Sequence, residues 1–72
     1  MDGSELAIFH VKEARRFQKD LIFAKRLTPE LAYKLERLLD DMGNDFNKIR
    51  GQQLQPLIMD SLLETIDSLR LL

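Results

Sequence analysis

The chain has 72 residues, 32% charged and 44% hydrophobic, which is the size and composition of one small folded domain. Lys and Arg number 11 and Asp and Glu number 12, so the net charge is −1 and the chain as a whole is not a general binder of polyanions. It contains no cysteine, which excludes disulfides, thiolate metal sites and thiol catalysis.

The first predicted element is a helix over residues 4–26. Its apolar residues recur at helical spacing and form one face, with His10 among them, while cationic residues fall on the opposite face. Asp2 and Glu5 have the spacing of a capping box, with Ser4 as a rival cap. The apolar face consists of Ala7, Val11, Ala14, Phe17, Leu21 and Ala24.

The second predicted element is a helix over residues 29–50. Thr28 is placed as its N-cap, followed by a proline that suits the first helical position. Gly43 is a possible end of this helix. Phe46 and Ile49 keep the phase of the preceding apolar stripe, however, which favours one continuous helix. An internal glycine is tolerated where a neighbouring helix comes close, and a break at Gly43 stays the main alternative. The stripe consists of Leu31, Leu35, Leu38, Leu39, Met42, Phe46 and Ile49.

The third predicted element is a helix over residues 56–71, after a connection over residues 51–55. Pro56 fits its first turn, and three acidic residues lie opposite its apolar face. The apolar face consists of Ile58, Met59, Leu62, Leu63, Ile66 and Leu69. No stretch approaches the roughly 18 apolar residues of a membrane span, and the acidic N-terminus lacks the positive region of a secretory signal. We therefore expect a cytoplasmic protein with no membrane contact.

These elements predict a single all-α domain over residues 1–72, an antiparallel helical hairpin plus a third helix. A chain of this size buries only about 60% of its unfolded surface, so its core is marginal. Several large apolar residues also fall outside the helix stripes, which favours a homodimeric helical bundle that covers them. The residues predicted for that oligomer interface are Ile8, Phe9, Ile22 and Leu71.

A basic stripe on the first helix is the sharpest functional feature. Residues 1–26 carry a net charge of +2 and residues 28–72 a net charge of −3. The leading hypothesis is a small non-enzymatic protein–protein interaction or regulatory module, with an apolar anchor set in a basic face. The residues predicted to bind the partner are Lys12, Arg15, Arg16, Lys19 and Phe23.

Three other interpretations of the basic stripe stay open. It could hold the phosphates of a nucleic acid, or the chain could be a pure oligomerisation element of a larger assembly. It could also be a solvated face whose charges pair with Glu13 or Asp20, or with the acidic face of the third helix across subunits. That acidic face consists of Asp60, Glu64 and Asp67.

The residues that could act in catalysis or bind a metal are not accompanied by the other residues that such a site needs. His10 is the single histidine, and a partly buried side chain with one hydrogen bond is favoured over a pH switch or a metal ligand. The carboxylate pair Glu36 and Asp40 has helical spacing and is typical of a solvated face, and there is no phosphate-binding glycine loop. We therefore expect no enzyme activity, no cofactor and no metal.

Overall fold

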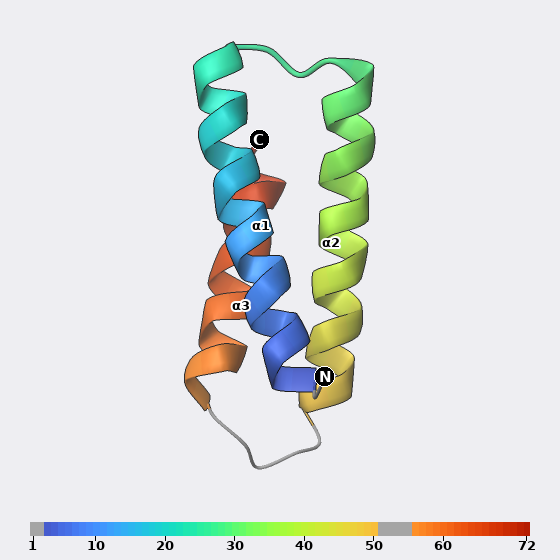
Figure 1. The fold of residues 1–72 in the computed structure, drawn as a ribbon, viewed down its shortest axis with the longest axis vertical. Helices are drawn as coiled ribbons and strands as arrows, with labels where there is room; N and C mark the ends of the chain where they lie inside the picture. The colour runs from blue at the N-terminus through green and yellow to red at the C-terminus, as the bar shows by residue number, and fades with distance from the viewer. Residues whose placement is uncertain (1–2, 51–55) are drawn as a thin grey trace.

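The computed structural model describes residues 3–50 and 56–72. These residues form three helices, α1 (Gly3–Ala24), α2 (Pro29–Ile49) and α3 (Pro56–Arg70), and none of the described residues forms a strand. Figure 1 shows α1 and α3 running in the same direction, with α2 antiparallel to both. The all-α prediction is confirmed. The cap at Asp2 and the connection over residues 51–55 lie outside the described residues.

The core lies along the axis of the bundle, which measures 39 × 19 × 17 Å. All three helices contribute to it through the apolar stripes expected from the sequence, because each helix can bury only the face it turns to the other two. Two members of those predicted faces are exposed instead, Ala24 at the end of α1 and Leu63 on α3. The largest fully buried side chains are Phe17, Met42, Ile49, Leu62 and Leu69.

The first helix ends earlier than expected because of Lys25. This residue has a φ of 60°, the left-handed conformation that closes many helices, and its N–H donates to the carbonyl oxygen of Leu21 at 3.0 Å. The sequence did not reveal this end, since glycine is the residue that ordinarily marks such a position. The helix therefore stops at Ala24, two residues before the predicted end.

The start of α2 follows the sequence signal. Thr28 has an extended backbone, and its hydroxyl oxygen accepts a hydrogen bond from the N–H of Leu31 at 3.2 Å. The carbonyl oxygen of Thr28 accepts from the N–H of Ala32 at 2.8 Å, which begins the helical ladder. The predicted N-cap is confirmed.

The second helix is continuous through Gly43, as the phase of its apolar stripe predicted. The reason offered for tolerating this glycine is wrong, however. A Cβ built on Gly43 would meet nothing within 4 Å, so no neighbouring helix comes close there. The in-phase residues Phe46 and Ile49 pack against the core, and that burial holds the helix together despite the glycine.

The third helix has 15 residues, against 22 in α1 and 21 in α2. Figure 1 shows that it ends before the α1–α2 connection, so two helices alone form that end of the molecule. We call residues 22–31 the hairpin tip. Leu27 is 48% exposed there and Leu31 is partly buried, because no third helix covers them.

Candidate interaction surface

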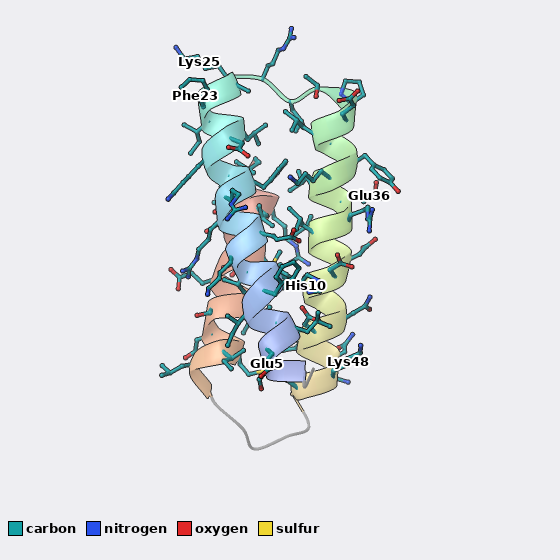
Figure 2. All side chains as sticks on the ribbon, viewed as in Figure 1. Glu5, His10, Phe23, Lys25, Glu36 and Lys48 are labelled. Atoms are coloured by element: carbon teal, nitrogen blue, oxygen red, sulfur yellow. The ribbon has the colours of Figure 1, made fainter. Side chains whose placement is uncertain are left out.

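The four cations of the basic stripe, Lys12, Arg15, Arg16 and Lys19, are all exposed on the outer face of α1. Phe23 is 89% exposed, the highest value among the large hydrophobic residues of the described chain. Figure 2 shows it near the end of α1, pointing away from the bundle. All five residues predicted to bind a partner are therefore on one helix and open to solvent.

The cations of this stripe have no acidic partner in the part of the chain that the structure describes. No carboxylate oxygen of residues 3–50 or 56–72 lies within 4.0 Å of their side-chain nitrogens. In particular, Arg16 pairs with neither Glu13 nor Asp20, although both lie within one helical turn of it. Pairing within α1 therefore does not account for these charges.

A chain of shallow grooves follows the line where α1 meets α3. The first groove, about 200 Å³, is mostly apolar and reaches from Ile8 and Leu57 to Arg15. The second, about 450 Å³, reaches from Arg15 to Ile22, and the third, about 240 Å³, from Ile22 to Leu72. Neighbouring grooves share Arg15 and Ile22, so the three grooves follow one another along this face. We call it the α1–α3 face.

The α3 side of this face has the opposite charge. Asp60, Glu64 and Asp67 are exposed, and Glu64 lines the middle groove together with Arg15 and Lys19. The acidic run has an exposed leucine near each end, Leu57 at 80% and Leu71 at 88%. Apolar residues thus stand at both ends of the α1–α3 face, with cations on one helix and anions on the other between them.

The groove between α1 and α2 has no comparable pattern. It has a volume of about 300 Å³ and contains two cations from α2 and one anion from each helix, together with one aromatic ring and one leucine. Charges of both signs at such short spacing give no surface of one sign for a partner to recognise. The lining residues are Glu13, Tyr33, Lys34, Arg37, Leu38 and Asp41.

His10 lies between α1 and α2, as Figure 2 shows, and is bonded to a buried acid. Its Nδ1 is 2.5 Å from Oδ2 of Asp45, whose exposure is only 2%. Because a carboxylate can only accept, the imidazole N–H donates this bond. Nε2 lies 3.9 Å from Oδ2 of Asp41, beyond hydrogen-bond range. This is the partly buried histidine with one hydrogen bond that the sequence favoured.

Asp45 is the residue of this pair that the sequence reasoning missed. It follows the possible stop at Gly43 by two residues, yet it lies three residues after Met42 and four before Ile49, on the buried stripe of α2. An acidic residue in phase with a buried stripe signals a polar partner across the core, because an unpaired buried carboxylate is costly. That signal was available in the sequence.

The described residues offer no group of three or more His, Cys, Asp or Glu side chains that could hold a metal ion. Among these same residues, no helix is long and apolar enough to cross a membrane. Comparisons with protein-family models, with curated proteins and with solved structures find no match for this chain. A functional conclusion therefore depends on the exposed surface of α1 and α3.

Proposed function

We propose that this protein is a non-enzymatic protein–protein interaction module that binds an acidic protein surface through the outer face of α1. The observation that carries the proposal is a stripe of exposed cations with no acidic partner in the described chain, next to an aromatic side chain that is 89% exposed. The residues of this face are Lys12, Arg15, Arg16, Lys19 and Phe23.

The chemistry of the face suits a protein better than a nucleic acid. Phe23 offers a large apolar area whose burial stabilises a complex, and aromatic and arginine side chains are enriched among residues that dominate binding energy. The cations around it would steer an acidic partner and set its orientation. A nucleic acid would meet four cations here on a chain whose net charge is −1, so the chain as a whole exerts no long-range attraction on a polyanion.

We include a homodimeric bundle and a cytoplasmic location in the same proposal. The four residues assigned to the oligomer interface are all exposed in the protomer: Ile8 at 41%, Phe9 at 52%, Ile22 at 71% and Leu71 at 88%. A second copy that covered them would remove apolar area from water, which is the main driving force of association.

Photo-crosslinking in cells of the source organism tests the proposal. A benzophenone analogue of phenylalanine replaces Phe23, and the matched control carries the same group in place of Glu36, which is exposed on α2 (Figure 2). We expect a protein adduct from position 23 and none from position 36. Equal adducts from both positions, or none from either, would contradict the proposal. Adducts to nucleic acid would favour the alternative function.

Charge reversal tests which residues carry the binding. Arg15→Glu combined with Arg16→Glu should reduce the adduct at position 23 about tenfold or more while leaving helicity intact, because both side chains are exposed. The control is Arg37→Glu, the same change at an exposed arginine of α2. Unchanged crosslinking in the Arg15 and Arg16 variant would overturn the assignment of these residues.

A further inference from the structure

The α1–α3 face carries two lines of residues spaced by seven. On α1 the line is Ile8, Arg15 and Ile22, and on α3 it continues from Leu57 through Glu64 to a leucine at position 71. Seven residues are just short of two helical turns, so each line stays on one side of its helix. In each line a charged residue lies between two apolar residues. The charged residues of the two lines, Arg15 and Glu64, have opposite signs.

The grooves fix the heights of the two lines. Ile8 shares a groove with Leu57, and Arg15 shares one with Glu64. Ile22 shares the last groove with Leu72, next to the end of the α3 line. The two lines therefore stand side by side at matching heights, over about 21 Å of helix axis.

Leu71 belongs to this line although it follows the last residue of α3. Its N–H donates to the carbonyl oxygen of Ser68 at 3.3 Å, and the N–H of Leu72 donates to Leu69 at 3.2 Å. These bonds continue the turn of the helix for two more residues. Leu71 consequently stays near the position that continues the spacing of Leu57 and Glu64, and Leu72 lines the last groove.

We propose that the acidic surface recognised by α1 is α3 of a second copy of this chain, in a parallel twofold dimer whose axis runs along the α1–α3 face. This inference rests on the proposed function, since it names the partner of three of the same cations, Lys12, Arg15 and Lys19. A twofold axis parallel to the helices places α1 of each copy on α3 of the other at the same height. Ile8 then meets Leu57 of the second copy, and Arg15 meets its Glu64.

Charge decides between this arrangement and its main rival. A twofold axis perpendicular to the helices would place α1 against α1, and Arg15 would face Arg15. Like charges opposed in an interface are unfavourable, and the acidic line of α3 would meet itself in the same way. The parallel axis instead opposes the cations that line the grooves, Lys12, Arg15 and Lys19, to the acidic side of α3, with apolar residues at both ends.

The exposed surface of the chain is several times larger than the area that a stable dimer buries. An interface of standard size buries about 800 Å² per partner, about one-seventh of the 5474 Å² that the chain exposes. Of the predicted oligomer residues, Ile8 and Ile22 line grooves of this face, and Leu71 follows the end of α3 next to Leu72, which lines the last groove. Phe9 does not lie on this face, because it points about 100° around α1 from Ile8 and packs beside the ring of His10.

Sedimentation equilibrium of the purified chain and its variants tests the dimer. We expect a dimer for the natural sequence, and weakening of about tenfold or more for Arg15→Glu and for Glu64→Arg, because each dimer contains two copies of the pair. Mixing these two variants should restore a dimer, since every reversed residue then meets an opposite charge. The chain that carries both changes should also dimerise. Arg37→Glu and Glu36→Arg on α2 are the matched controls.

Disulfide trapping tests the orientation, and the natural chain contains no cysteine that would interfere. Ile8→Cys mixed with Leu57→Cys should form a heterodimeric disulfide, whereas Ile8→Cys mixed with Ile22→Cys should not. The second pair would crosslink in the antiparallel rival. A preference for that pair would overturn the parallel arrangement.

The oligomeric state and the crosslinking at position 23 together distinguish the dimer from the interaction module. A natural chain that stays monomeric at high concentration overturns the dimer. If position 23 still forms an adduct with another protein in cells, the interaction module stands and its partner is a different acidic protein. A monomer that gives no adduct overturns both.

Discussion

The two ends of the α1–α2 hairpin differ in what covers them. Beside α3 the large side chains are closed off from solvent, and Phe17, Met42 and Leu62 are each at most 1% exposed. At the hairpin tip the exposures rise to 48% for Leu27 and 89% for Phe23. Packing against α3 therefore stabilises one end of the hairpin, while capping and turn interactions of the local backbone stabilise the other end. Substitutions of matched chemistry at the two ends should show this difference.

The largest difference is expected for leucine truncations. Leu62→Ala, at a site with 0% exposure, should lower the free energy of unfolding by about 2–5 kcal/mol, because it leaves a cavity among three helices. Leu31→Ala at the hairpin tip should cost about 1 kcal/mol, since the side chain is only partly buried. Urea unfolding followed by circular dichroism measures both. Equal losses would show that the side chain of Leu31 is covered in solution.

The next largest effect concerns the buried pair of His10 and Asp45. His10→Leu should destabilise the protein by about 1–3 kcal/mol, because it leaves the carboxylate of Asp45 without its hydrogen bond at 2% exposure. The double variant with Asp45→Leu should cost less than the sum of the two single changes, since it removes both polar groups from the core.

Asp41→Asn is the control for this pair. Its carboxylate lies 3.9 Å from the imidazole and is 41% exposed, so the change should stay within about 0.5 kcal/mol. Strict additivity of the two leucine substitutions would contradict a direct coupling between His10 and Asp45. Thermal or urea unfolding of the four proteins in the cycle provides the measurement.

A smaller effect is expected at the hairpin tip from the N-cap of α2. Thr28→Ala removes the acceptor for the N–H of Leu31 and should cost about 1 kcal/mol. Thr28→Ser retains the hydroxyl and should leave stability nearly unchanged. Hydrogen exchange of the amides in the first turn of α2 should rise in the alanine variant alone. A uniform rise along α2 would mean that the cap supports the whole helix and not only the tip.

The contrast between the two ends also explains which features the sequence could predict. Thr28 and the proline after it predict the start of α2, because capping depends on neighbouring residues alone. The left-handed Lys25 was not predictable, since lysine carries no preference for that conformation.

The candidate surface was predictable only in part. Helical periodicity was enough to place Arg15 and Lys19 on an exposed face of α1. The alignment of Ile8 with Leu57 depends on how α1 and α3 pack side by side, which periodicity within one helix cannot reveal. The burial of Asp45 was signalled by its phase, but its partner His10 became evident only from the contact between α1 and α2.

The smallest predicted effect is a gain in stability from Gly43→Ala. Gly43 lies within α2, next to the buried Met42, yet a Cβ added to Gly43 meets nothing within 4 Å. The φ angle of Gly43 is not positive. The change should therefore stabilise the protein by up to about 1 kcal/mol through helix propensity alone, with Gly43→Ser giving a smaller gain in the same direction. Urea unfolding of the three proteins at low concentration measures the order Ala, Ser, Gly. A loss with alanine would mean that another surface approaches Gly43 in solution. Because α2 lies away from the α1–α3 face, that surface would be a second contact and not the proposed dimer.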